Sequence, residues 1–183
     1  MRKIVAGLFI SLDGVVEAPH EWHFPYFNDE MGEAVDSQIT AADTMLLGRV
    51  TYQEFASYWP HQGSEVVLAD YMNTTPKLVV STTLDRVEWQ NSTLIKGNVA
   101  EELTKLKQQP GKNISITGSG TLVRSLLRDG VLDELRLLVH PIVVGRGKRL
   151  FPDMSERVEL KLVDSQTFST GVLYLTYQQA QRE

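Results

Sequence analysis

The chain has 183 residues, of which 42% are hydrophobic and 22% are charged, a composition typical of one globular domain. Lysine and arginine number 18 against 23 aspartates and glutamates, so the formal net charge is −5 and a broad nucleic-acid-binding face is not expected. A local basic pocket for one small anion is compatible with this charge. The absence of cysteine excludes disulfides, thiolate metal sites and cysteine nucleophiles.

The sequence predicts a soluble, cytoplasmic protein with one domain spanning residues 1–183. The apolar run at the N-terminus stops at Ser11 and Asp13, where turn residues follow in place of a signal-peptide cleavage site. No segment approaches the roughly 18 consecutive apolar residues that a membrane-spanning helix needs. We therefore expect neither a leader nor a membrane partner.

The first half of the chain alternates predicted strands and helices. Residues 3–12 form a β-rich apolar segment ending at an Asp-Gly turn, and residues 15–28 form a loop that contains four aromatic side chains. Apolar residues at helical spacing then predict a helix over about 29–42. The other predicted elements of this half are strands at 44–47, 78–81 and 93–95, and helices beginning at the Thr51–Glu54 capping box, at 64–72, and from Val99 to the residue before Pro110.

The second half begins with the same alternation and ends in β structure. A strand at 113–117, a Gly-Ser-Gly turn and a helix at 121–129 are followed by predicted strands at 135–140, 158–163 and 172–177. Strands that alternate with helices indicate a parallel sheet covered on both faces, and the last strands indicate an antiparallel edge. The predicted fold class is therefore α/β, with three layers (α/β/α) and a mostly parallel central sheet.

Ligands of open α/β sheets bind beyond the carboxyl ends of the strands, in the loops that lead into helices. Three segments of this chain have that form, at 47–51, 80–83 and 117–121. Each segment places small or hydroxyl residues where backbone N–H groups become available, so together they are candidates for a nucleotide-binding site.

The segment 117–121 is the most informative of the three. Gly118 and Gly120 lack a Cβ, so the backbone can turn sharply and approach a phosphate closely. The helix that follows supplies free N–H groups, and Ser119 and Thr121 add hydroxyl donors. Val123 stands where a complete dinucleotide fingerprint has its third glycine. A purely structural turn between a strand and a helix is the alternative interpretation.

Arg49 lies at a predicted helix N-terminus, where the helix dipole disfavours a cation by about 0.3–1 kcal/mol. An anion bound between the arginine and the helix would explain this placement, whereas a solvent-exposed side chain or a pair with an acid is the alternative. With Ser81 and Thr82, Arg49 would form a pocket for a ribose 2′-phosphate. That pocket would favour NADPH over NADH.

A reductase that transfers a hydride to a C=N bond also needs a proton for the nitrogen. Asp13, in the turn after the first strand, is the candidate donor, and a structural role in its Asp-Gly turn is the alternative. The four histidines lack metal-ligand spacing, so no metal is expected. His20 and His23 are interpreted as surface loop residues, and a position in the lining of a pocket is the alternative. The chain has no Gly-x-Ser-x-Gly elbow, which argues against a hydrolase.

Taken together, the motifs resemble the dihydrofolate reductase-like superfamily, and within it the C-terminal reductase domain of the bifunctional riboflavin-biosynthesis deaminase-reductase. The resemblance spans nearly the whole chain in order. It is carried by Ser11-Leu12-Asp13-Gly14, Leu47-Gly48-Arg49-Val50-Thr51-Tyr52, Val80-Ser81, Ile116-Thr117-Gly118-Ser119-Gly120-Thr121-Leu122, and the segment from Pro141 to Phe151.

The resemblance implies a twisted, mostly parallel sheet, NADPH as the cofactor, a small-molecule heterocycle or ribosylaminopyrimidine as the substrate, and a homodimer. It assigns the cofactor to Gly48, Arg49, Thr51, Ser81, Thr82, Gly118, Ser119, Gly120 and Thr121. The substrate is expected between the 11–16 turn, the 29–42 helix and the aromatic loop with Trp22, Phe24 and Tyr26.

Two departures from the family pattern qualify this expectation. Dihydrofolate reductases carry an acid near the start of the first long helix, but that position falls near Gly32 here, so folate reduction is not favoured. The zinc deaminase half of the riboflavin enzyme is missing from the chain. A non-catalytic module that retains the nucleotide site is the competing hypothesis, and flavin binding is a third.

Overall fold

The centre of the structure is one sheet of eight strands. The computed structural model describes residues 1–154 and 156–180. The strands are β1 (Ile4–Ser11), β2 (Ala42–Gly48), β3 (Lys77–Val80), β4 (Ser92–Ile95), β5 (Asn113–Gly118), β6 (Glu134–His140), β7 (Leu160–Thr167) and β8 (Leu173–Gln179). Their order in the sheet is β4-β3-β2-β5-β1-β6-β8-β7. The first six strands in this order run parallel, whereas β8 runs antiparallel to both of its neighbours.

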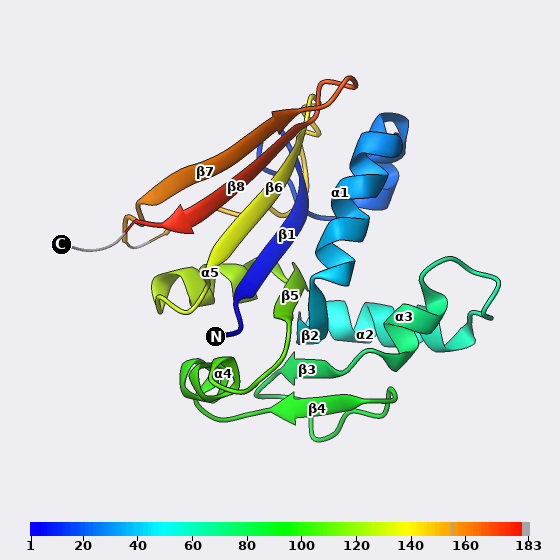
Figure 1. The fold of residues 1–183 in the computed structure, drawn as a ribbon, viewed down its shortest axis with the longest axis vertical. Helices are drawn as coiled ribbons and strands as arrows, with labels where there is room; N and C mark the ends of the chain where they lie inside the picture. Colours follow the sequence, from blue (N-terminus) through cyan, green and yellow to red (C-terminus); the bar gives the residue numbers. More distant parts are fainter. Residues whose placement is uncertain (155, 181–183) are drawn as a thin grey trace.

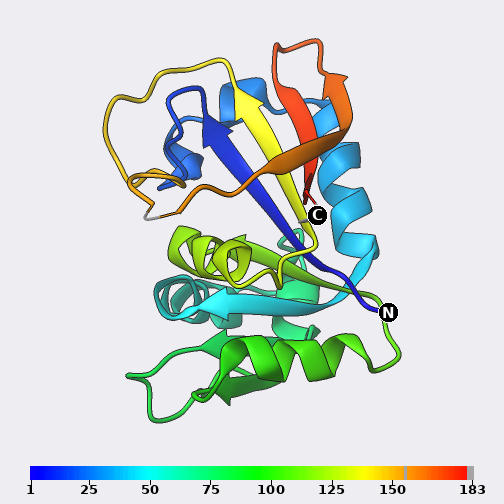
Figure 2. The ribbon, with the colours of Figure 1, turned by 90° about the vertical axis from the view of Figure 1, so that its left-hand side faces the viewer.

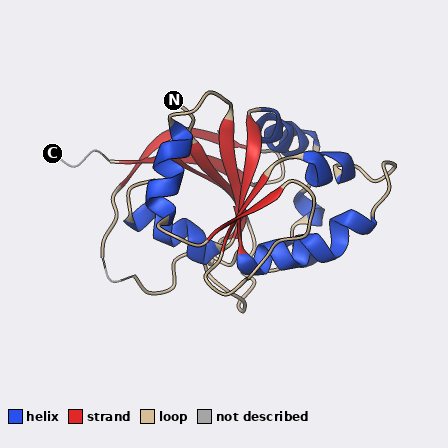
Figure 3. Cartoon of the chain, turned by 90° about the horizontal axis from the view of Figure 1, so that it is seen from below, coloured by secondary structure: helices blue, strands red, loops and turns tan. Residues whose placement is uncertain are grey.

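Helices cover both faces of this sheet (Figures 1 and 3). They are α1 (Asp29–Thr40), α2 (Arg49–Tyr58), α3 (Ala69–Thr74), α4 (Val99–Lys107) and α5 (Gly120–Arg128). In Figure 1, α1, α2 and α3 lie on one side of the strands, and α4 and α5 lie on the other. This three-layer arrangement with a mostly parallel sheet and an antiparallel edge confirms the predicted fold class. Within the described residues, no helix is both long and apolar enough to cross a membrane.

The largest core lies between the sheet and the layer of α4 and α5. Helix α5 carries Leu122, Val123, Leu126 and Leu127 on one face, and all four side chains are buried. They pack against the inward-facing residues of β1, including Ile4, which is fully buried. Because β1 lies between β5 and β6 near the middle of the sheet, its sequence is nearly continuously apolar, as expected for a central parallel strand.

The helix predicted at the Thr51–Glu54 capping box begins earlier than expected. Helix α2 starts at Arg49, and its N-cap is Gly48, which has an extended backbone and provides no side-chain acceptor. The capping-box prediction was wrong because β2 runs directly to Gly48, so Thr51 already lies inside the first turn. The cap predicted for α4 is confirmed, since Asn98 Oδ1 accepts the N–H of Glu101 at 3.2 Å.

Two further element boundaries differ from the predictions. Helix α3 begins at Ala69, because residues 64–68 form turns that end at Leu68 with a positive φ of 72°. Strand β7 begins at Leu160, where its pairing with β8 begins, and it extends to Thr167. Tertiary pairing therefore decides where this edge strand starts and ends.

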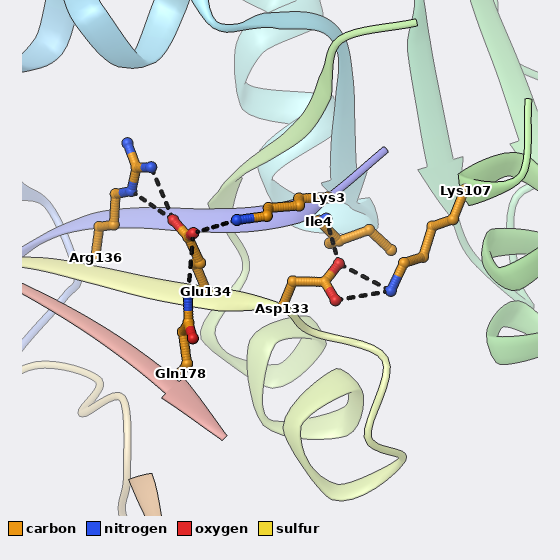
Figure 4. Close-up of polar contacts among 7 residues, drawn as sticks. All are labelled: Lys3, Ile4, Lys107, Asp133, Glu134, Arg136 and Gln178. Carbon is orange, nitrogen blue, oxygen red and sulfur yellow. Dashed lines mark hydrogen bonds and ion pairs between the residues drawn. The ribbon is translucent and has the colours of Figure 1, made fainter. Parts of the chain in front are cut away.

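Polar contacts at the start of β6 connect three elements at the edge of the sheet opposite the candidate ligand loops (Figure 4). Asp133 Oδ2 accepts the backbone N–H of Ile4 at 2.8 Å, and the same carboxylate pairs with Lys107 at 2.8 Å. The Lys107 side chain is only 14% exposed, so this pair is shielded from solvent. Asp133 therefore joins the first strand, the end of α4 and the start of β6.

We predict that Asp133→Ala lowers the free energy of unfolding by about 2 kcal/mol, because the Ile4 amide and the Lys107 ammonium both lose their partner. Urea unfolding measures this change. Asp129→Ala is the matched control, since Asp129 forms only an exposed pair with Arg128, and its effect should stay within about 0.5 kcal/mol. Equal losses in the two variants would contradict the assigned role of Asp133.

Candidate functional site

Three candidate ligand loops lie side by side at the carboxyl edge of the sheet. Strands β3, β2 and β5 are neighbours, with Gly48 opposite Val80 and Leu47 opposite Gly118. The segments that follow these strands therefore start at the same edge, and Figure 2 shows this edge from the side. Parallel strands force this outcome, because all their carboxyl ends point the same way.

Two of these loops are in direct contact through their glycines. A Cβ on Gly48 would lie 2.7 Å from Ser119 Oγ and 3.3 Å from the Ser119 backbone nitrogen. A Cβ on Gly118 would lie 2.6 Å from Thr51 Oγ1. The peptide bond between Gly118 and Ser119 is cis. The two backbones thus approach so closely that neither glycine position has room for a side chain.

The same contact brings two helix N-termini together. Gly48 is the N-cap of α2 and leaves the first amides of that helix without a side-chain acceptor. Ser119 is the N-cap of α5, and its Oγ accepts the N–H of Leu122 at 3.3 Å. Each N-terminus carries free N–H groups and the positive end of a helix dipole. Their proximity creates a local field that favours an anion, although the chain as a whole is negative.

The cation nearest to this field is Arg49, the first residue of α2. Its side chain is exposed, and Nη1 donates to Gln53 Oε1 at 3.1 Å. In the described part of the chain it forms no ion pair, so the alternative of an acidic partner is not what the structure shows. Its guanidinium is therefore able to bind an anion from solvent.

The hydroxyl residues of the other loops differ in their availability. Ser81 is buried, and its Oγ accepts the N–H groups of Thr83 and Leu84 at 3.1 and 3.0 Å, so it holds the turn after β3. Thr82 and Thr121 are exposed. Gly120 is the first residue of α5 and precedes Thr121. The structure therefore brings all the predicted cofactor residues to one edge, but the Ser81 side chain is already engaged.

Asp13, the candidate proton donor, accepts several hydrogen bonds. Its carboxylate accepts from Ser11 Oγ at 2.5 Å and from the N–H groups of Val144 and Gly145 at 3.1 and 2.8 Å. The hydrogen bond from Ser11, with those from the backbone, lowers the pKa of Asp13 to about 2. A carboxylate held ionised in this way is suited to anchoring the segment after β6, and it is a poor proton donor.

The aromatic loop packs around one buried histidine at the end of β6. Trp22 and Tyr26 contact the ring of His140 edge-on, with centroid distances of 5.1 and 5.5 Å. Phe24 packs against the ring of His23 at a centroid distance of 4.6 Å, and its side chain is 63% exposed. Of the three aromatic residues predicted to contact substrate, Trp22 and Tyr26 therefore pack on His140, and Phe24 packs on His23.

His23, predicted at the surface, is in fact buried, because it stacks on Phe9 at 4.4 Å and lies 5.8 Å from His140. His140 Nδ1 donates to the Leu138 carbonyl at 2.7 Å. Within the described residues, His140 Nε2 and His23 Nδ1 have no hydrogen-bond partner. Burial lowers the pKa of His23, and the neighbouring His140 lowers it further. Burial also lowers the pKa of His140, although its hydrogen bond to Leu138 opposes that effect.

These lowered pKa values predict an acid-sensitive fold. Below the unfolded-state pKa of about 6.5, the unfolded chain binds protons that the folded chain rejects, so the free energy of unfolding falls as the pH falls. His23→Phe should reduce the dependence of the free energy of unfolding on pH between about pH 6.5 and 5, because phenylalanine can stack on Phe9 and binds no proton. Urea unfolding at several pH values across this range measures this slope.

The control for this prediction is His20→Gln, since His20 is an exposed residue of the same loop. This variant should keep the slope of the wild-type chain. A slope that is unchanged in His23→Phe would show that the buried histidine pair does not control the acid sensitivity.

A cavity of about 320 Å³ lies on the sheet face that carries α1, α2 and α3. Its floor is the part of β1 and β5 that none of these helices covers. Its walls are α1 on one side and α2, η3 (Trp59–His61) and α3 on the other. The lining includes Phe9, Gln38, Phe55, Trp59, Tyr71, Ser115, Thr117 and Arg136. A volume and lining of this kind are typical of small-molecule sites.

The polar residues of this cavity were not among the predicted site residues. On β5, Asn113, Ser115 and Thr117 alternate with buried Ile114 and Ile116, so one face of a central strand is polar. That alternation was the available signal, since a strand buried on both faces is usually apolar throughout. The acids of the 29–36 segment do not line the cavity.

Comparisons with known proteins support the same fold. The family model of the RibD C-terminal domain matches residues 2–174. YyaP of Bacillus subtilis (strain 168), itself uncharacterized, is 34% identical over 180 residues, which cover 96% of this chain and 94% of YyaP.

Two solved structures align over nearly the whole chain. The first is a Shewanella sp. PV-4 protein whose name assigns it provisionally to riboflavin biosynthesis, with a TM-score of 0.76, 20% identity, and 98% of this chain and 99% of that chain covered. The second is Enterococcus faecalis dihydrofolate reductase complexed with NADP(H), with a TM-score of 0.64, 16% identity, and 98% and 97% covered. These alignments confirm the dihydrofolate reductase-like fold that the motifs implied.

Proposed function

The chain belongs to the RibD C-terminal domain family, that of the riboflavin-biosynthesis reductases, and we propose that it is an NADPH-dependent oxidoreductase that reduces a pterin- or pyrimidine-type heterocycle. The observation that carries this proposal is the contact between Gly48 and Ser119, which joins two helix N-termini beside Arg49, a cation without an ion pair among the described residues. That arrangement fits a dinucleotide with a pyrophosphate and a further phosphate.

The residues present fit this cofactor. The pyrophosphate would lie against the free amides of α2 and α5, which Gly48 and Gly118 allow to begin next to each other. The 2′-phosphate would pair with Arg49 beside the turn that contains Thr82. When bound, NADPH supplies the hydride. The chain supplies the phosphate contacts and the orientation, which is the usual division of work in cofactor enzymes.

The proposed substrate site is the cavity, because it adjoins the proposed cofactor site. Thr117 lines the cavity and directly precedes Gly118. Val16 also lines it, and lies 3.7 Å from the position of a Cβ on Gly120. Hydride transfer to a C=N carbon would be balanced by a proton added at nitrogen. The lining residues with exchangeable hydroxyl protons are Tyr71, Ser115 and Thr117, and solvent water is the other source.

We predict that Arg49→Ala weakens NADPH binding about tenfold or more, because a charge-assisted contact to phosphate is lost, and changes NADH binding less than about threefold. Titration followed by tryptophan fluorescence measures both affinities. Arg128→Ala, an exposed arginine at the far end of α5, is the control and should change neither. Equal losses for the two nucleotides would mean that Arg49 does not bind the 2′-phosphate.

The second prediction concerns the glycine contact. Gly48→Ala should weaken the binding of NADPH and of NADH alike, by about tenfold or more, because the new Cβ pushes Ser119 and the N-terminus of α5 away. Gly97→Ala is the control, since no atom lies within 4 Å of its added Cβ. Unchanged affinities in Gly48→Ala would locate the dinucleotide elsewhere.

Turnover separates the proposed reductase from the non-catalytic alternative. Loss of NADPH absorbance with a panel of pterins and pyrimidines is expected for a reductase. NADPH binding without turnover of any substrate would favour the nucleotide-binding module.

A further inference from the structure

The cavity beside the proposed cofactor site is lined almost entirely by uncharged groups. Among its described lining residues there is no aspartate, glutamate, lysine or histidine, and Arg136 is the one charged member. A substrate that carries a phosphate or a carboxylate needs a cation, and a substrate recognised through a protonated ring needs an acid. Whether the cavity accepts a charged substrate therefore depends on whether Arg136 is free to pair with it.

Arg136 is already paired within the chain (Figure 4). Its Nε and Nη2 donate to the same oxygen of Glu134, at 3.1 and 2.7 Å, and the Glu134 side chain is only 8% exposed. The other oxygen of Glu134 accepts from Lys3 at 3.1 Å and from Gln178 at 3.4 Å. Burial opposes ionisation of Glu134, yet these hydrogen bonds lower its pKa overall.

The Glu134 carboxylate neutralises the Arg136 guanidinium, so an anion bound to the remaining N–H groups of Arg136 would also lie near a buried carboxylate. An anion that displaced Glu134 would leave that carboxylate buried with fewer partners, which is strongly unfavourable. The one cation of the described cavity lining is therefore neutralised by an acid of the same chain.

The groups able to recognise a ligand are neutral. Ser115 and Thr117 on β5, Tyr71 on α3 and Gln38 on α1 bring hydroxyl and amide groups to the cavity. Gln38 Nε2 donates to Tyr174 Oη at 2.9 Å, and Gln38 Oε1 occupies the space that a Cβ on Gly7 would take. This hydrogen bond fixes the orientation of the amide.

The remaining lining is apolar and rich in aromatic rings. Phe9, Phe55 and Trp59 provide flat apolar surfaces around the neutral donors and acceptors. Burial raises the pKa of Tyr71, so its hydroxyl stays protonated at neutral pH. A cavity of about 320 Å³ is near the lower end of the range for small-molecule sites, which favours a compact ring system.

We propose, on the basis of the reductase function above, that the substrate is a neutral planar heterocycle that carries neither a phosphate nor a carboxylate group. The aromatic walls hold the ring, and the hydroxyl and amide groups bind its polar atoms. A ribosylaminopyrimidine without its phosphate and a pterin without a glutamate tail belong to this class.

The test compares matched ligands that differ in one charged group. Calorimetry measures their binding to the full chain saturated with NADP⁺, which prevents turnover. The pairs are a ribosylaminopyrimidine and its 5′-phosphate, and a dihydropterin and its 6-carboxy derivative. The neutral member of at least one pair should bind about tenfold or more tightly than its charged partner, because the charged group finds no free counter-ion.

Two outcomes would overturn this proposal. One is charged members that bind as tightly as their neutral partners, and the other is no binding by any neutral member. Binding of NADP⁺ is measured first in the same sample. Its absence would overturn the reductase function itself, whereas normal NADP⁺ binding with a preference for charged ligands would overturn the substrate class alone.

The variant Glu134→Gln sharpens the test, because it keeps the shape of the side chain and releases Arg136 from its carboxylate. It should raise the affinity for the phosphorylated ligand about tenfold and leave the neutral ligand nearly unchanged. Glu102→Gln, on the exposed face of α4, is the control. A phosphorylated ligand that gains nothing from Glu134→Gln, in a variant whose thermal melting shows it to be folded, would contradict the role of this pair.

Discussion

The register of β2 against β5 is the constraint on which the site depends. With Leu47 opposite Gly118, the chain leaves both strands at the same level, and Gly48 meets Ser119 at a distance that excludes a Cβ. Helices α2 and α5 therefore begin next to each other, with their free amides and dipoles directed at one point. A shift of one residue in the register of β5 would turn its side chains to the opposite face of the sheet and separate these N-termini.

The cavity follows from the way the helices share one face of the sheet. Helix α1 covers β1, β6 and β8, whereas α2 and α3 cover β2 and β3, so part of β1 and β5 forms the floor between them. Floor positions carry small or polar residues such as Gly7 and Ser115, both half-buried. The carboxyl end of β5 belongs to the cavity at Thr117 and to the proposed cofactor loop at Gly118, so the fold joins the two sites through one strand.

Charge is distributed so that each end of the sheet has a different role. Near the start of β6, Asp133 and Glu134 neutralise the surrounding cations and connect β1, α4 and β6. At the opposite edge, Asp13 anchors the segment after β6, and Arg49 has no acidic partner among the described residues. A net charge of −5 is thus compatible with anion binding, because two helix N-termini and one cation determine the local field.

The amino-acid sequence by itself determined the fold class, the order of most elements and the three loops of the proposed cofactor site. Hydrophobic periodicity and the Gly-Ser-Gly turn are local signals, and parallel strands bring their carboxyl ends together whatever the details. The tertiary structure decided the rest. Burial of His23, the engagement of Asp13 and the cavity above Ser115 depend on contacts between distant segments. Periodicity in one segment carries no information about which side chain another segment will cover, so only the packed chain could show them.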